Sequence, residues 1–407
     1  MNSLYILGAG ASRELKFTTT KADLADGIKK SSHNVNGHLS SGFFYYTNEF
    51  LKEVKQFNNF GTDIKLNDEW LKRFIIDFYF KKNKVPVTMS KIIENKKISE
   101  KINIEELYME IEKKLAKLEL KSKQMDKFNT EYLEAFFGEG DLLQYIHEVF
   151  STISYYCYSI YHRVFAHYLI QTGGDVISFN WDILLEEEMF ESNQWNYCDG
   201  YGFSSAGVVD KNKLMRLKGY DYQKRCESSR NIILKPHGSI NWYKLRKNGE
   251  SDFVDNPNAV FIGIPMTRSR ALRGGTQGRL KFCEIDRRSN SIQYESLIVP
   301  PGRKRKRFSF IWDKIIRKIE EADYIRAIGF SFNDFDKHIV EEISRAKVKE
   351  GVKIDVINPD DNVVQKYKET FKTNYVHKTF NRFSEYCKWI TTQSGMEDFA
   401  DIIKNDK

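Results

Sequence analysis

The sequence predicts an α/β fold, a Rossmann-like doubly wound parallel sheet with a large, mostly helical insertion. Over residues 150–390, short apolar runs that are typical of buried strands alternate with helical segments. A glycine-containing turn follows the first run, and polar residues follow the later ones. A long stretch after the first run shows helical periodicity and no buried-strand pattern. These three observations predict one sheet-forming domain whose sequence is split.

The first strand is predicted at residues 3–8, directly before the turn Gly8, Ala9, Gly10, Ala11 and Ser12. A strand, a turn of small residues and a following helix let backbone N–H groups approach a pyrophosphate, and the helix dipole favours the anion. Arg13 stands where the dinucleotide-binding pattern has its third glycine. A tight turn without a ligand is the alternative.

Residues 21–149 are predicted to form the helical insertion, or cap, and residues 1–20 and 150–390 the split sheet domain. The stretch is rich in Lys, Glu, Phe and Tyr. Within 103–121, apolar residues recur at three- and four-residue steps, as on one face of a helix. They are Ile104, Leu107, Ile111, Leu115 and Leu118.

The second part of the chain alternates between the two kinds of element. Helices are expected at 155–171, 183–191 and around 310–322, and strands at 175–182, 231–243, 295–300, 324–332 and 353–360. Strands separated by crossover helices predict a parallel sheet. The polar residues after each strand would then share the edge where such sheets bind ligands.

Two strand ends carry candidate catalytic residues. Asn180, in Ser-Phe-Asn-Trp-Asp, can hold ribose hydroxyls or a water, and Asp182 can grip an amide. His237, in Pro-His-Gly-Ser, can point into a cleft and titrate near neutral pH, as a base requires. The alternatives are a turn for Asn180, a helix N-cap for Asp182 and a structural histidine. His162 and His167 fall in a helical segment and are expected to be structural or solvated.

Two more strand ends carry small or amide residues. Gly329 and Ser331 follow one strand, where Ser331 can bond phosphate, and Asn358 follows another, where it can contact a ribose. The alternatives are that these residues form the N-cap of the helix after Asp336, or an Asx turn.

Composition narrows the class of protein. The chain has 407 residues, a formal net charge of +8 and five cysteines without a C-x-x-C pair. This pattern is typical of reduced thiols and gives no structural zinc knuckle. We see no signal peptide and no apolar run long enough for a membrane span. A cytoplasmic protein is expected.

The five turn motifs, in this order, resemble the sirtuin-like NAD-binding fold, and more narrowly its bacterial branch in anti-phage defence systems. The resemblance covers about residues 1–15 and 150–365. It implies an NAD+ hydrolase with Asn180 and His237 as catalytic residues. It implies further contacts to NAD from Gly8, Ala9, Gly10, Ala11, Ser12, Asp182, Gly329, Ser331 and Asn358.

The chain departs from deacylase sirtuins in lacking their four zinc-binding cysteines, so no zinc is expected. The resemblance also implies a homo-oligomer, gating of activity, and a HerA-type ATPase as partner. Three alternatives remain: a regulatory module that senses NAD or ADP-ribose, a protein deacylase, and a nucleic-acid-binding protein that uses the basic run Arg303–Arg307.

Overall fold

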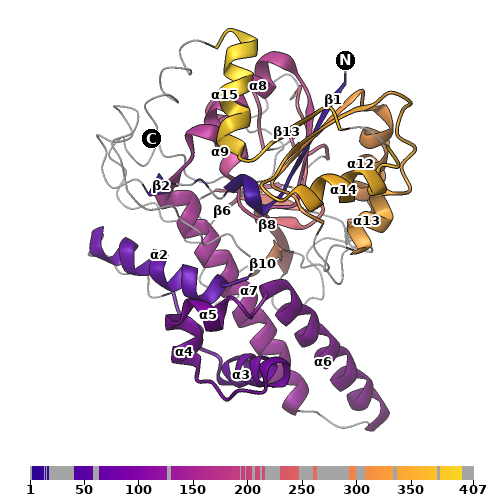
Figure 1. The fold of residues 1–407 in the computed structure, drawn as a ribbon. Helices are drawn as coiled ribbons and strands as arrows, with labels where there is room; N and C mark the ends of the chain where they lie inside the picture. The colour runs from indigo at the N-terminus through magenta and orange to yellow at the C-terminus, as the bar shows by residue number, and fades with distance from the viewer. Residues whose placement is uncertain are drawn as a thin grey trace. The chain divides into compact units, whose positions relative to one another are not determined.

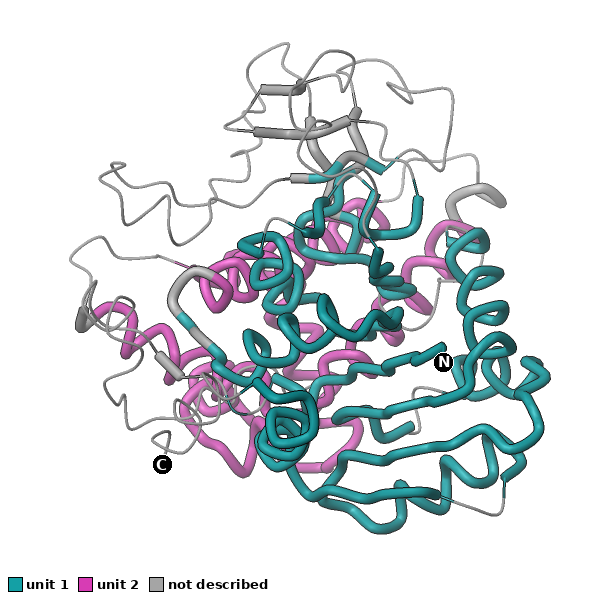
Figure 2. The backbone as a smooth tube through the Cα atoms, turned by 90° about the horizontal axis from the view of Figure 1, so that it is seen from above, with its two compact units in different colours: residues 1–34, 157–299, 304–407 teal, residues 35–156, 300–303 magenta. Residues whose placement is uncertain are grey.

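The computed structural model describes residues 2–12, 14, 16–17, 41–57, 64–125, 130–192, 194–197, 199–203, 207–210, 213–215, 230–246, 260–263, 293–298, 308–332, 337–373 and 376–396. The chain divides into two compact units (Figure 2). Unit 1 comprises residues 1–34, 157–299 and 304–407, and unit 2 comprises residues 35–156 and 300–303.

Unit 1 is built on a six-stranded parallel sheet, which confirms the predicted α/β class. Its strand order is β13-β12-β11-β1-β4-β7. The strands are β1 (Ser3–Leu7), β4 (Asp175–Ser178), β7 (Ile233–Leu234), β11 (Tyr324–Ile328), β12 (Lys353–Ile357) and β13 (Lys378–Phe380).

The order of the strands places the switch point of the sheet between β1 and β11. From β1 the chain runs through β4 to β7 in one direction, and through β11 and β12 to β13 in the other. Numbered along the chain, the order becomes 3-2-1-4-5-6, which is the order of dinucleotide-binding folds. In such sheets ligands bind outside the carboxyl ends of the strands that flank the switch point.

Helices cover both faces of this sheet (Figure 1). One group is α8 (Ile160–Thr172), α9 (Leu184–Glu191) and α15 (Phe383–Ser394), and the other is α12 (Ser309–Glu321), α13 (Lys337–Ile343) and α14 (Asp361–Thr370). The central strands are therefore buried on both sides, and all five residues of β11 are buried. Continuous apolar runs are what such strands need.

A second sheet in unit 1 has the order β10-β8-β9-β5-β6. Its strands are β5 (Gly207–Asp210), β6 (Lys213–Met215), β8 (Gly238–Arg246), β9 (Phe261–Gly263) and β10 (Gln293–Ile298). Two short strands, β2 (Lys16–Phe17) and β3 (Cys157–Tyr158), pair separately.

Two runs predicted as strands of the parallel sheet lie wholly or partly in the second sheet. The apolar run at 231–243 divides into β7, in the parallel sheet, and β8, in the second sheet. The run predicted at 295–300 forms β10, which pairs antiparallel with β8. The chain changes sheets at Gly238, where φ is +72° and a Cβ atom would stand 1.8 Å from the Leu297 carbonyl oxygen. Only glycine fits this corner.

The described elements of unit 2 are helices: α2 (Phe43–Phe57), α3 (Glu69–Asn83), α4 (Met89–Glu94), α5 (Lys96–Ser99), α6 (Ile104–Met125) and α7 (Thr130–Tyr156). The periodic residues that predicted α6 are at most 3% exposed. The helix expected at 155–171 is two elements instead, because α7 ends at Tyr156 and α8 begins at Ile160. That this unit is an insertion into the sheet domain stays a prediction.

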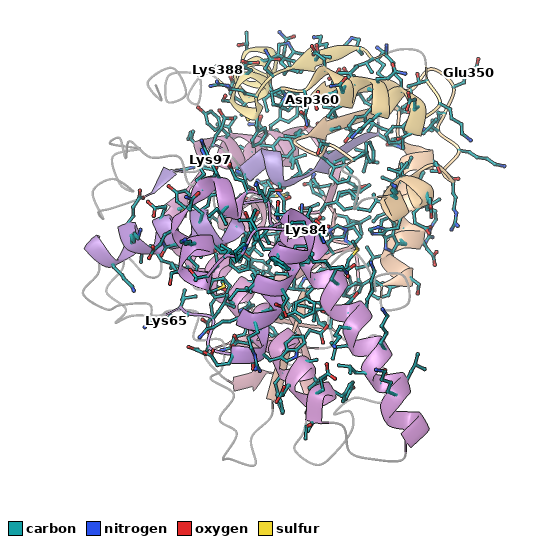
Figure 3. The ribbon with its side chains drawn as sticks, turned by 60° about the horizontal axis from the view of Figure 1, so that its bottom comes forward. Lys65, Lys84, Lys97, Glu350, Asp360 and Lys388 are labelled. Carbon is teal, nitrogen blue, oxygen red and sulfur yellow. The ribbon has the colours of Figure 1, made fainter. Side chains whose placement is uncertain are left out.

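Exposed charged side chains occur in both units. Those labelled in Figure 3 are all exposed: Lys65, Lys84, Lys97, Glu350, Asp360 and Lys388. None of the helices in the described residues is long and apolar enough to cross a membrane.

Candidate functional site

The parallel sheet brings the five predicted motifs to one edge. Because β1, β4, β7, β11 and β12 are parallel neighbours, their carboxyl ends meet there. Backbone hydrogen bonds continue one residue beyond the strands, from Gly8 N to Ile328 O and from Phe179 N to Leu7 O, each 2.9 Å long. The first residues of these turns therefore have fixed positions.

The turn after β1 is held mainly by the turn after β11. Gly10 N donates to Gly329 O at 2.9 Å, and a Cβ atom on Gly8 would lie 2.6 Å from the Cα atom of Phe330. Gly329 has φ +66°, and its own Cβ atom would stand 2.2 Å from Ala11 N. The contact of the two turns thus accounts for all three glycines by itself.

The helix expected after this turn is a 3-10 helix of four residues, Ala9–Ser12. The amides of Gly8, Gly10 and Ala11 already donate to backbone carbonyls. Phosphate binding by the turn stays a prediction, and it would have to use donors other than these three.

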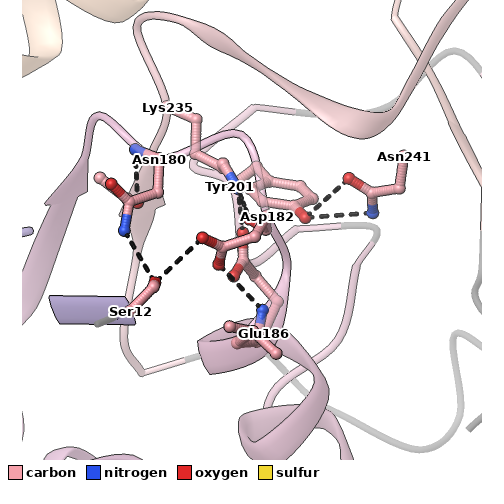
Figure 4. A network of polar contacts seen from close by, with 9 residues as sticks. Ser12, Asn180, Asp182, Glu186, Tyr201, Lys235 and Asn241 are labelled. Atoms are coloured by element: carbon pink, nitrogen blue, oxygen red, sulfur yellow. Dashed lines mark hydrogen bonds and ion pairs between the residues drawn. The ribbon is translucent and has the colours of Figure 1, made fainter. Parts of the chain in front are cut away.

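A hydrogen-bonded chain joins the turn after β1 to the turn after β4 (Figure 4). Asn180 Nδ2 donates to Gly8 O at 3.1 Å and to Ser12 Oγ at 3.4 Å. Ser12 Oγ donates to Asp182 Oδ2 at 3.1 Å. The carbonyl and the carboxylate can only accept, so the amide must point its nitrogen at Gly8 and the hydroxyl must point its proton at Asp182.

The three residues differ in exposure. Ser12 is completely buried and Asp182 is 4% exposed, while Asn180 is half-buried. Asp182 Oδ1 also accepts from Leu184 N at 3.3 Å, although the N-cap residue of α9 is Ile183. Asp182 therefore has a local role at the start of α9 and a second one toward Ser12.

A buried ion pair supports the turn after β4, and the sequence did not single it out. Lys235 Nζ donates to Glu186 Oε1 at 2.7 Å and to the carbonyl oxygen of Asp182. The two side chains are 0% and 3% exposed. Burial raises the pKa of Glu186, and the Lys235 ammonium opposes that rise. The available signal was an acidic helix after one parallel strand together with a lysine at the end of the next parallel strand along the chain.

A buried hydrogen-bonded pair, Tyr201 and Asn241, lies near Glu186. Tyr201 OH and the side-chain amide of Asn241 are within hydrogen-bond distance, at 3.1 Å and 3.2 Å (Figure 4). Burial raises the pKa of Tyr201 well above its ordinary value, and the nearby Glu186 adds to the rise. The hydroxyl therefore stays protonated and acts in hydrogen bonding.

His237 lies in the turn between β7 and β8 and is 2% exposed. Its ring meets the edge of Phe179 at a centroid distance of 5.0 Å and lies nearly parallel to His338 at 6.4 Å. Phe179 in turn stacks on Phe330 at 4.3 Å. Since Phe179 directly precedes Asn180, this aromatic contact places both predicted catalytic residues in one neighbourhood.

The remaining predicted residues lie further along the same edge. Ser331 is half-buried, and its carbonyl and that of Phe332 face Lys366 Nζ, at 3.5 and 3.0 Å. Asn358 Oδ1 accepts from Asp360 N at 3.0 Å, so it forms the Asx turn that the sequence left open. No described contact joins Ser331 or Asn358 to Asn180 or His237.

The remaining predictions concern His162, metal binding and the basic run. His162 is structural: it is 2% exposed, and its Nδ1 lies 2.8 Å from Ser159 Oγ. Among the described residues, no group of three or more His, Cys, Asp and Glu side chains is placed to hold a metal ion. The basic run Arg303–Arg307 and residues 333–336 lie outside the described residues.

Comparison with protein-family models gives no match for this chain, and comparison with curated proteins gives no significant similarity.

Proposed function

We propose that the chain is an NAD+ glycohydrolase that cleaves the nicotinamide–ribose bond and yields nicotinamide and ADP-ribose. The observation that carries the proposal is the hydrogen-bonded chain from Gly8 through Asn180 and Ser12 to Asp182. It lies at the carboxyl edge of the parallel sheet and begins at β1, one of the two strands that flank the switch point, where sheets of this order bind dinucleotides.

Cleavage of the nicotinamide–ribose bond depends more on the orientation of the ribose than on acid catalysis. Nicotinamide leaves as a neutral molecule from a pyridinium that is already charged, so departure needs no general acid, unlike ordinary glycoside hydrolysis. The protein has to hold the ribose and admit one nucleophile. The side-chain amide of Asn180 uses its nitrogen in the contacts to Gly8 and Ser12, so its Oδ1 is the atom to accept from a ribose hydroxyl or a water.

His237 is assigned the role of proton acceptor. Its ring is covered in this structure, with Phe179 against it. Proton transfer to the imidazole therefore requires part of this cover to move when the substrate binds. Asp182 orders Ser12, and through Ser12 it fixes the amide of Asn180.

The test is to incubate the purified chain with NAD and to resolve nicotinamide and ADP-ribose over time. Asn180→Ala and His237→Ala should each lower the rate by about a hundredfold or more, because both act at the reacting ribose. Asn362→Ala, an exposed asparagine on α14, and His167→Gln, on α8, are the matched controls and should keep the wild-type rate. Unchanged release in a folded Asn180 or His237 variant contradicts the assignment.

The burial of His237 favours one second candidate, a regulatory module that binds NAD or ADP-ribose without cleaving it. Such a module needs the edge of the sheet but no accessible base. Tight binding of ADP-ribose with no nicotinamide release, alone or with a co-purified partner, would support it and overturn the hydrolase proposal.

A role in anti-phage defence, assembly into a homo-oligomer and gating by a HerA-type ATPase belong to the same proposal. They depend on the resemblance of the five motifs, and co-purification with such an ATPase is their direct test.

A further inference from the structure

Lys235 connects the two turns that carry the predicted catalytic residues. It follows β7 directly and stands two positions before His237. Its ammonium reaches the carbonyl oxygen of Asp182, two positions after Asn180. One fully buried side chain thus bridges the end of β7 and the turn after β4 (Figure 4).

Charge pairing alone does not explain this arrangement. A buried ammonium needs a counter-ion, and Glu186 supplies it at 2.7 Å. The second bond goes to a main-chain carbonyl, which adds no neutralisation. It fixes the backbone at Asp182, where the parallel ladder of β4 has already ended.

We propose that Lys235 is a positioning residue that sets the separation of Asn180 from His237, with Glu186 holding the ammonium in place. The inference rests on the proposed function for its catalytic consequence. Lys235 touches no reacting atom, so its effect passes through the turn at residues 179–183.

The decisive variant removes both charges, Lys235→Met with Glu186→Met. Lys235→Met alone leaves a buried carboxylate without its counter-ion, and that variant can fail to fold. Replacing a buried pair by apolar side chains of similar size is often neutral for stability, so the double variant should melt within about 4 °C of the wild type. It keeps the packing volume but lacks the donor to Asp182.

Two readouts separate positioning from a purely structural role. The kcat for nicotinamide release should fall about a hundredfold in the double variant, with KM changing much less, because misplacement of about an ångström can cost that much. Amide hydrogen exchange at residues 179–183 should become faster, while exchange in β1 and β11 stays as in the wild type.

The control is Lys318→Met, which removes an ion pair of 2.9 Å to Asp175 at the opposite end of β4. It should change neither kcat nor exchange at 179–183. A double variant with wild-type exchange in this turn, or with wild-type kcat, overturns the inference. If the wild-type chain releases no nicotinamide at all, the proposed function fails, and the exchange measurement alone still decides whether Lys235 positions the turn.

Discussion

Two buried ion pairs in the described part of unit 1 are built in different ways. At the carboxyl edge of the parallel sheet, Lys235 and Glu186 pair between a strand end and a helix. At the middle of the strands, Arg326 and Asp355 lie on adjacent strands at the same register, with Arg326 Nε 3.6 Å from Asp355 Oδ2. We call the second group, Tyr5, Tyr324, Arg326, Asp355 and His377, the strand cluster.

Members of the strand cluster contact one another closely. The Arg326 guanidinium lies 3.8 Å from the centroid of the Tyr324 ring and 5.2 Å from that of Tyr5, and it donates to Tyr5 OH at 3.0 Å. Asp355 is completely buried and accepts from Tyr324 OH. The regular backbone ladder already fixes the positions of Tyr5, Tyr324, Arg326 and Asp355.

Beyond the first turn residues, the described part of the carboxyl edge has single backbone bonds in place of a regular ladder, such as that from Ile240 N to Trp181 O at 3.1 Å. There the side chains of Ser12, Asp182 and Lys235 bond across turns, and the half-buried Asn180 stands at the end of their network. We therefore expect the buried pair between strands to serve the fold, and the buried pair between a strand end and a helix to position the candidate site. Disruption of the first should change stability alone, and disruption of the second should change function.

The largest expected effect is that of Asp355→Ala. It leaves the Arg326 guanidinium in the sheet without its carboxylate, and removal of one member of a buried ion pair costs about 3–5 kcal/mol. Urea unfolding should show this loss in the free energy of unfolding. NAD turnover per folded molecule should stay unchanged, and a specific loss of turnover would contradict the proposed separation of roles.

Ser12→Ala should have a smaller effect on stability and a clear one on function. It removes a hydrogen bond to a carboxylate, worth about 1.5–3 kcal/mol, and frees the amide of Asn180. Nicotinamide release should fall by about tenfold or more at saturating NAD. Ser3→Ala is the matched control, since Ser3 Oγ accepts from Arg326 in the strand cluster; equal turnover in the two variants would remove the functional distinction.

The smallest expected effect is a pH dependence of stability that comes from His167. This residue lies on α8, and the Phe165 ring of the same helix packs on Tyr5. Burial lowers the pKa of His167 below its ordinary value of 6.5, and the Arg163 charge adds to this. The neutral form is therefore favoured in the folded state, so the contribution to stability is present above pH 6.5 and is lost as the pH falls through the lowered pKa.

Melting curves between about pH 7.5 and 5 test the sign of this effect. The wild-type chain should lose stability relative to His167→Gln as the pH falls, and a difference that does not depend on pH would exclude His167 as the cause.

Much of the fold could be predicted from local pattern. Apolar runs predicted β1, β4, β11 and β12, because strands buried on both faces need continuous apolar side chains. The sixth strand, Lys378–Phe380, is short and only partly buried, so it gave no such signal. The run at 295–300 had a strand pattern, but its pattern does not say which sheet it joins.

Some residues of the candidate site could be predicted from the sequence, and others could not. Polar residues after apolar strands indicated Asn180, Asp182 and His237, because residues at the carboxyl ends of parallel strands must share an edge. Lys235 and Glu186 were missed, since their pairing spans 49 positions in the chain and neither residue type is unusual where it stands.

The sequence by itself determined which segments form buried strands and which residue types end them, because periodicity and turn chemistry are local properties. Only the tertiary structure decided the strand order, the change of sheet at Gly238, the contact between the turns at Gly10 and Gly329, and the partners of Asn180. Those depend on residues far apart in the chain, and packing alone brings them within hydrogen-bond distance.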